Sequence, residues 1–128
     1  MALHVTGDHG FINANTFESL RVWGAAVGID FSVLPGYQTG KETFGILYNY
    51  FADLNFQSEA ARYQSGVQNV TGVHNTFTEV NVWDIPAPPA MTIGPTADRT
   101  LVIGGTLAGE YAANPGVIQD QGRATRIV

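Results

Sequence analysis

The sequence predicts a mainly β fold, a small β-sandwich or barrel with one to three short helices and extended terminal or loop arms. Val, Ile and Thr number 32, against seven Leu and one Lys, and β-branched side chains favour pleated sheets over helices. The 15 glycines and six prolines interrupt the chain often, as expected where short strands alternate with turns. A chain of 128 residues is the length of a single domain, so we treat 1–128 as one unit.

The first candidate element is a helix over 15–28. Asn15 is a suitable N-cap, and Glu18 follows three residues later as its reciprocal partner. Gly28 is a suitable helix stop. Apolar and small residues recur at helical spacing in between, at Phe17, Leu20, Gly24 and Val27. A strand through 20–23 is the competing interpretation.

The segment 43–56 fits two patterns. Aromatic and apolar residues alternate as in a strand at Phe44, Ile46, Tyr48 and Tyr50, but they also repeat at helical spacing at Phe44, Leu47, Phe51 and Leu54. Its tyrosines and phenylalanines favour a strand. The following residues, 58–63, are expected to form one or two helical turns.

The segment 76–85 gives the clearest strand pattern and is followed by Pro86. Four prolines then fall between residues 86 and 95. Proline cannot donate a ladder hydrogen bond, so we expect 86–95 to cross the surface and not to form a central strand.

The last third of the chain begins with a short buried strand over 99–104. Residues 110–128 then offer two alternatives. They form a hairpin turning at 114–116 with a final strand, or a C-terminal arm that docks on a neighbouring molecule. We expect no internal repeat and no low-complexity segment anywhere in the chain.

Side chains that could carry catalysis or hold a cofactor are sparse. There is no cysteine, which excludes disulfides, thiolate zinc sites and a thiol nucleophile. His4, Asp8 and His9 are too few for a metal site, and Lys41 follows a glycine pair with the wrong spacing for a phosphate-binding loop. We therefore predict no catalytic residue, metal or cofactor, and a protein that is not an enzyme.

Charge and hydropathy exclude two kinds of partner. The net charge is −5 and the isoelectric point is near 4.9, whereas nucleic-acid binders concentrate Lys and Arg. No apolar run reaches membrane-spanning length, and the first residues lack the pattern of a signal peptide. We expect a protein that is made in a cytoplasm and binds neither nucleic acid nor membrane.

The balance of apolar and charged residues predicts an assembly. Hydrophobic residues make up 45% of the chain and charged residues 13%, about half the charged fraction of ordinary soluble domains. Much of the surface is then expected to be hidden in a homo-oligomer, for which a trimer is favoured. Aromatic residues with polar atoms and the residues of the tail are the candidate interface: Trp23, Tyr37, Trp83, Tyr111, Arg123, Arg126, Ile127 and Val128.

In overall character the chain resembles small virion structural proteins of tailed bacteriophages, in particular capsid decoration (cement) proteins. The resemblance lies in the start Met1-Ala-Leu-His-Val-Thr-Gly7, the lack of cysteine, the single lysine, the proline-rich crossing and the tail Arg123-Ala-Thr-Arg-Ile-Val128. It implies a β-rich protein of the virion that bridges neighbouring subunits of the major capsid protein.

Two other functions remain open. One is a different phage assembly component, such as a tail-tube, head-completion or fibre subunit. The other is a small carbohydrate-binding β-domain, in which exposed aromatic side chains stack on sugar rings.

Overall fold

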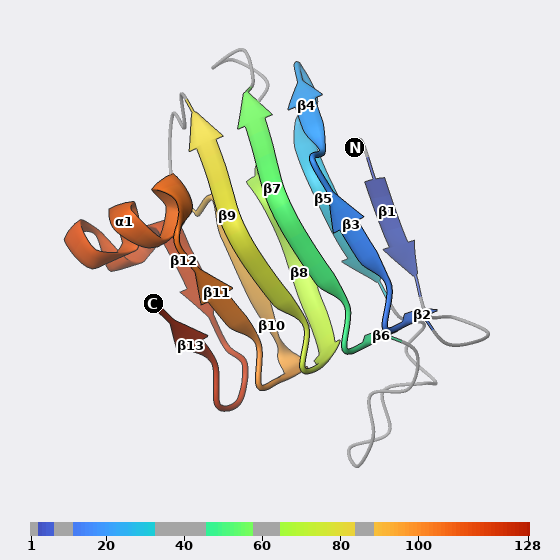
Figure 1. Cartoon of the computed structure of the whole chain (residues 1–128). Coiled ribbons are helices and arrows are strands. Elements are labelled where there is room, and N and C mark those ends of the chain that lie inside the picture. Colours follow the sequence, from blue (N-terminus) through green and yellow to red (C-terminus); the bar gives the residue numbers. More distant parts are fainter. Residues whose placement is uncertain (1–2, 7–11, 33–45, 58–64, 84–88) are drawn as a thin grey trace.

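The computed structural model describes residues 3–6, 12–32, 46–57, 65–83 and 89–128. Within them the chain winds back and forth between two facing β-sheets, which we name sheet A and sheet B (Figure 1). Sheet A contains β1 (Leu3–Thr6), β2 (Ile12–Asn13), β5 (Val27–Ser32), β6 (Ile46–Leu47), β8 (Ser65–Val73), β10 (Met91–Asp98) and β12 (Ile118–Asp120). Sheet B contains β3 (Thr16–Glu18), β4 (Arg21–Trp23), β7 (Tyr50–Gln57), β9 (Thr76–Trp83), β11 (Leu101–Ile103) and β13 (Arg126–Ile127).

Every named strand pair in both sheets is parallel. Successive circuits of the chain place corresponding residues side by side, for example Thr16, Tyr50, Thr76, Leu101 and Arg126 in sheet B. Each circuit therefore extends both sheets by one strand position, which makes the protein a two-sheet β-solenoid. The expectation of a mainly β chain is confirmed. In each circuit the chain passes once through sheet A and once through sheet B.

The corner from sheet A to sheet B has the same form in every circuit. A residue with positive φ comes first, and the position is held by Ala14, Tyr48, His74, Arg99 and Ala124. An asparagine or threonine follows it, namely Asn15, Asn49, Asn75, Thr100 and Thr125. Main-chain bonds join the stacked corners, such as His74 N to Asp98 O at 2.9 Å.

Stacked aromatic rings fill the space between the sheets. Phe17, Phe51 and Phe77 stack along sheet B, with ring centroids 4.7 and 4.9 Å apart and planes within 9° of parallel. Phe31 from sheet A meets Phe51 and Phe77 edge-on. Such parallel and edge-on pairs are both favourable, and they fix the distance between the sheets.

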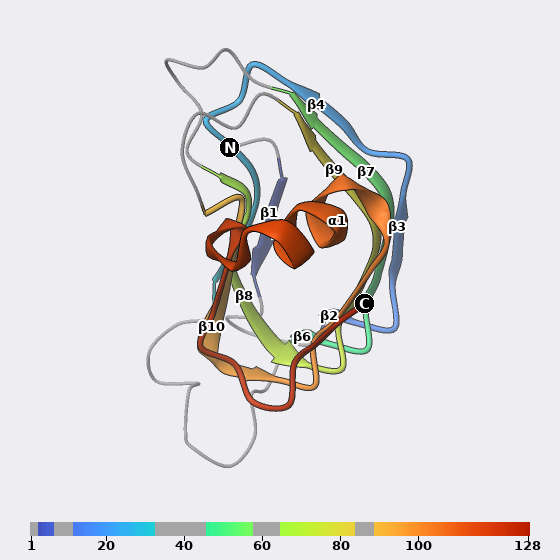
Figure 2. The same cartoon turned by 90° about the vertical axis from the view of Figure 1, so that its left-hand side faces the viewer.

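A helix lies beside the core at the C-terminal end of the solenoid. Helix α1 (Gly105–Ala113) buries Leu107 and Ala108 and packs on β9, and Figure 2 shows it lying across the gap between the two sheets. The short 3-10 turn η2 (Pro115–Val117) then returns the chain to β12. Among the described residues no helix is long and apolar enough to cross a membrane.

The expected helix over 15–28 is wrong. The segment forms β3 and β4 and enters β5. Asn15 sits at a solenoid corner, where its side chain donates to Asn49 Oδ1 at 3.2 Å. The apolar residues taken for one helix face, Phe17 and Leu20, instead pack against the core from the inner side of sheet B.

The expected surface crossing over 86–95 is wrong for its second half. Residues 84–88 lie outside the described residues, but Met91 to Pro95 belong to β10. Met91 and Ile93 pair with β8 on one side and β12 on the other. Pro95 is tolerated because the β8 register shifts between Ile93 and Ala97, so no ladder donor is needed there.

The expectation of no internal repeat is also wrong. Three segments beginning at Asn15, Asn49 and Asn75 share the order Asn, Thr or Tyr, Phe, any residue, acidic residue or Ser, Leu or Val. They occupy equivalent places in sheet B. The first two asparagines are 34 residues apart and the next two 26, so the repeat has no fixed period.

Other expected strands agree with the structure. The strand preferred within 43–56 is β6 and β7, the strand at 76–85 is β9, and the strand at 99–104 is β11. The hairpin expected to turn at 114–116 is wrong, because 110–113 end helix α1, which was not predicted, and η2 follows at Pro115–Val117. β12 and β13 then pair in parallel with β10 and β11, so the tail pairs with its own sheets and only its final strand agrees with the expectation. The expected helical turn at 58–63 lies outside the described residues.

Candidate functional site: the outer face of sheet B

Exposed tryptophans mark one end of the outer face of sheet B. Val22, Phe56 and Val82 point into the core, so the residues after them, Trp23, Gln57 and Trp83, point to solvent. Trp23 is 81% exposed and Trp83 48%. β4, β7 and β9 end at the same edge of the sheet (Figure 1).

The two tryptophans lie in one row across three strands. Trp23 is the register partner of Gln57, and Gln57 is the partner of Trp83. Because neighbouring strands lie about 4.8 Å apart, the two tryptophan positions are separated by roughly 9.6 Å. We name Trp23, Gln57 and Trp83 the tryptophan row.

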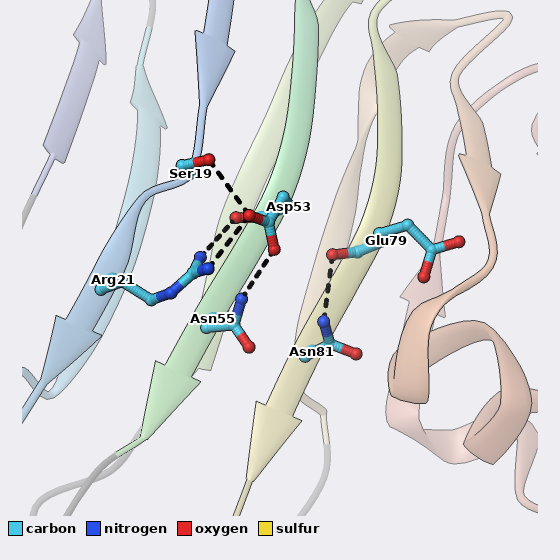
Figure 3. A network of polar contacts seen from close by, with 6 residues as sticks. All are labelled: Ser19, Arg21, Asp53, Asn55, Glu79 and Asn81. Atoms are coloured by element: carbon cyan, nitrogen blue, oxygen red, sulfur yellow. Dashed lines mark hydrogen bonds and ion pairs between the residues drawn. The ribbon is translucent and has the colours of Figure 1, made fainter.

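Two rows of polar side chains lie next to the tryptophan row. Arg21, Asn55 and Asn81 are register partners on the same three strands. Beyond them, Ser19, Asp53 and Glu79 all have positive φ, of 56°, 50° and 53°. Between β3 and β4, and within β7 and β9, this conformation places an additional side chain on the outer face without changing the register of the strands. Figure 3 shows the six residues side by side.

Asp53 is at the centre of the polar rows. Its carboxylate accepts hydrogen bonds from Arg21 Nη2 at 3.0 Å, Ser19 Oγ at 3.1 Å and Asn55 Nδ2 at 3.1 Å. Arg21 Nη1 also donates to the Asp53 carbonyl at 2.9 Å. The hydrogen bonds from Arg21 and Ser19 lower the pKa of Asp53 below its ordinary value, so this carboxylate is ionised at neutral pH and fixed in orientation.

Glu79 offers a carboxylate that no described residue engages by a hydrogen bond. Its side chain extends towards the turn before α1 (Figure 3) and lies over Gly104, where a Cβ atom would collide with it. The side chain of Asn81 is fixed, because its Oδ1 accepts a hydrogen bond from the Thr106 N–H at 3.0 Å. The face therefore combines fixed polar groups with one carboxylate that can accept hydrogen bonds from a ligand.

This arrangement offers two kinds of contact to a ligand. Flat exposed rings lie beside fixed amide, guanidinium and carboxylate groups, which can contact both the apolar faces and the hydroxyl groups of one ligand.

The structure places the described interface candidates in four regions. Trp23 and Trp83 share the tryptophan row, and Tyr111 is partly buried on α1. Arg123 pairs with Asp98 at 2.9 Å. The remaining described candidates lie in or next to β13: Arg126 is exposed, Ile127 packs on the core and Val128 is 66% exposed. Tyr37 lies outside the described residues.

Sequence reasoning missed Gln57 and the two polar rows. The signal that identifies them is the repeat, because its alignment places Asp53 and Glu79 at one position and Asn55 and Asn81 at another. Without that alignment, nothing in the sequence relates Asp53 to Glu79 or Asn55 to Asn81.

The absence of a metal site and of a phosphate-binding loop remains a prediction. Asp8, His9 and Lys41 lie outside the described residues. His4 Nε2 lies 2.6 Å from Ser32 Oγ, and the part of the chain that the structure describes holds no group of three or more His, Asp and Glu side chains suited to a metal ion.

Comparison with protein-family models, curated proteins and solved structures returns no match.

Proposed function

We propose that this protein binds carbohydrate on the outer face of sheet B. The observation that carries the proposal is the tryptophan row, in which Trp23 is 81% and Trp83 48% exposed. Single exposed apolar residues are common on protein surfaces. Two tryptophans in one register row beside polar rows are better explained by a ligand with apolar ring faces and many hydroxyl groups.

The chemistry of a sugar chain fits the three rows. The C–H face of a pyranose ring packs on the electron-rich face of an indole. With the two tryptophans two strands apart, each can stack on a different ring of one chain, while Gln57 lies between them. Asn55, Asp53 and Glu79 then supply acceptors and donors for the hydroxyl groups.

The test is a glycan microarray of bacterial and plant polysaccharides, followed by calorimetric titration of the glycans that bind. We expect Trp23→Ala and Trp83→Ala each to weaken binding about tenfold, and the double variant to abolish it on the array. Tyr48→Ala is the matched control, because Tyr48 is an aromatic residue, 58% exposed, at a solenoid corner away from this face. Equal binding by the wild type and the double variant contradicts the proposal.

A virion structural role is the second candidate, and the open edge of sheet B favours it. Among the described residues β13 pairs only with β11, so its other side presents main-chain groups that none of them pairs with. Exposed Ile103 and Val128 lie close to it. Together with the low charge, this edge supports a decoration protein that forms a homo-oligomer, with a trimer favoured, and bridges subunits of a major capsid protein in the virion.

The two candidates differ in measurable ways. A decoration protein is oligomeric in sedimentation at micromolar concentration or binds capsids, and its assembly survives high salt because the contacts are uncharged. A fibre subunit with a glycan-binding face satisfies both the carbohydrate and the assembly proposals. A monomer that binds neither glycans nor capsids contradicts both.

A further inference from the structure

The outer face of sheet A carries a separate cleft. Its volume is about 460 Å³, within the range of roughly 300–1,000 Å³ that is usual for small-molecule sites. Three neighbouring strands, β8, β10 and β12, supply most of its lining. The lining residues that present polar groups or a ring to the cleft are Gln68, Asn69, Thr92, Pro95, Gln119 and Gln121.

Two irregularities in strand pairing produce the hollow. Between the pairs Met91–Val67 and Ile93–Val70, β8 has one residue more than β10. Before the next pair, Ala97–Gly72, β10 has two residues more than β8. The additional residues in β10 lie around Gly94, which has no side chain, and Pro95, which has no N–H group, so the sheet surface is locally opened.

The first bulge turns two consecutive polar side chains outward. Asn69 has a φ of 58° and is exposed, next to half-buried Gln68. Asn69 is held in place, because its N–H donates to Thr92 Oγ1 and its Nδ2 to Asp30 Oδ1, both at 2.8 Å. The floor of the cleft is therefore fixed before any ligand arrives.

Three glutamines around this floor have unused amide groups. Gln68 is in register with Asp30, Gln119 is in register with Thr92, and the Gln121 N–H donates to Ile93 O at 2.9 Å. None of the three side chains hydrogen-bonds to a described residue, so each presents a donor and an acceptor at the cleft.

We propose that this cleft binds a neutral saccharide unit of one or two sugar rings. The described lining residues are uncharged, so they offer no counter-charge to an ionic ligand. Paired amide donors and acceptors match hydroxyl groups, which both donate and accept. The exposed ring of Pro95 supplies an apolar contact for a sugar face. The proposal does not rest on the tryptophan row, because the two sheets face opposite sides of the molecule (Figure 2).

The test uses saturation-transfer NMR with glucose, galactose, N-acetylglucosamine, maltose, lactose and N,N′-diacetylchitobiose, with glucuronic acid as the charged comparison. All measurements use the Trp23→Ala/Trp83→Ala variant, so that sheet B cannot contribute. We expect at least one neutral sugar to bind, and Gln68→Ala/Gln119→Ala, added to this background, to weaken it at least tenfold. Asn13→Ala, which removes an exposed amide side chain that does not line the cleft, is the matched control and leaves the signal unchanged.

Circular dichroism confirms that each variant is folded before titration. The proposal is overturned if no neutral sugar binds at millimolar concentration, if glucuronic acid binds in preference, or if the glutamine double variant binds as its parent does. Since sheet B is disabled throughout, these outcomes are independent of whether the tryptophan row binds glycans.

Discussion

Asn49 and Asn75 lie one above the other at the corner of successive circuits, and both the main-chain N–H and the side-chain amide of Asn49 donate to Asn75 Oδ1, at 3.0 and 3.1 Å. Asn15 donates to Asn49 Oδ1 in the same way, at 3.1 and 3.2 Å. This asparagine ladder satisfies buried polar groups at the corner, and thereby sets the register in which the rows of sheet B are aligned.

Removing the middle of the ladder should be costly. Asn49 is 1% exposed, and its Nδ2 also donates to Ile12 O at 2.8 Å. Asn49→Ala leaves buried groups without partners, so we expect the free energy of unfolding to fall by about 3 kcal/mol. Urea denaturation measures this loss. Asn15→Ala, at the exposed end of the ladder, is the control and should cost under about 1 kcal/mol of unfolding free energy. Equal losses in the two variants would contradict the larger contribution expected of the buried Asn49.

Extending the ladder should be favourable. Thr100 occupies the corresponding corner of the next circuit, is 1% exposed, and its Oγ1 has no hydrogen-bond partner among the described residues. In Thr100→Asn the new Oδ1 can accept from the Asn75 N–H, as Asn75 Oδ1 does from Asn49. We expect a gain of about 1 kcal/mol in urea denaturation. A lower denaturation midpoint than that of the wild type would show that the corner does not accommodate asparagine.

The pH dependence of stability should report the Asp98–Arg123 pair. The hydrogen bond from Arg123 and its charge lower the pKa of Asp98, with Arg99 and His74 adding to the effect. A carboxylate whose pKa is lower in the folded state stabilises the fold above its unfolded pKa, about 3.9, and this contribution is lost as the pH falls through the folded pKa.

We therefore expect that in Asp98→Asn the free energy of unfolding decreases less than in the wild type as the pH is lowered from about 5 to about 2. Denaturant titrations across this range measure the slope. Arg123→Gln, which removes the principal cause of the shift, should flatten it in the same direction. An unchanged slope in both variants would exclude this pair as a source of acid sensitivity.

Glycan binding on sheet B should depend on Asp53 and be insensitive to pH near neutrality. Because Arg21 and Ser19 hold the pKa of Asp53 below its ordinary value, its carboxylate remains ionised from about pH 5 to 8, and the affinity should be constant over that range. Asp53→Asn should weaken binding several-fold in calorimetry, since the amide no longer orders Arg21 and Ser19. Affinity that follows a titration in this interval would point to a different group.

The class of secondary structure could be predicted from composition, but the topology could not. β-branched residues and frequent glycines identify strands, whereas the parallel pairing depends on contacts between residues more than 20 positions apart. The helix expected at 15–28 was wrong because Asn15 and Glu18 satisfy the rules for a helix start, while tertiary pairing with β7 determines the actual structure.

The candidate site was only partly predictable, for a related reason. Trp23 and Trp83 stood out as amphipathic aromatics, but nothing local places them in one row. Aligning Asn15, Asn49 and Asn75 as corner residues would have done so. The unequal spacing between them, 34 and then 26 residues, hides the repeat from a search at a fixed period.

Carbohydrate binding by the tryptophan row can be tested through intrinsic fluorescence, because the chain contains two tryptophans and both lie in this row. Titration with a glycan selected on the array should shift the emission to shorter wavelength and protect it from acrylamide quenching, with a midpoint equal to the calorimetric dissociation constant. If the glycan binds by calorimetry while tryptophan emission and quenching stay unchanged, the ligand lies elsewhere and the claim is contradicted.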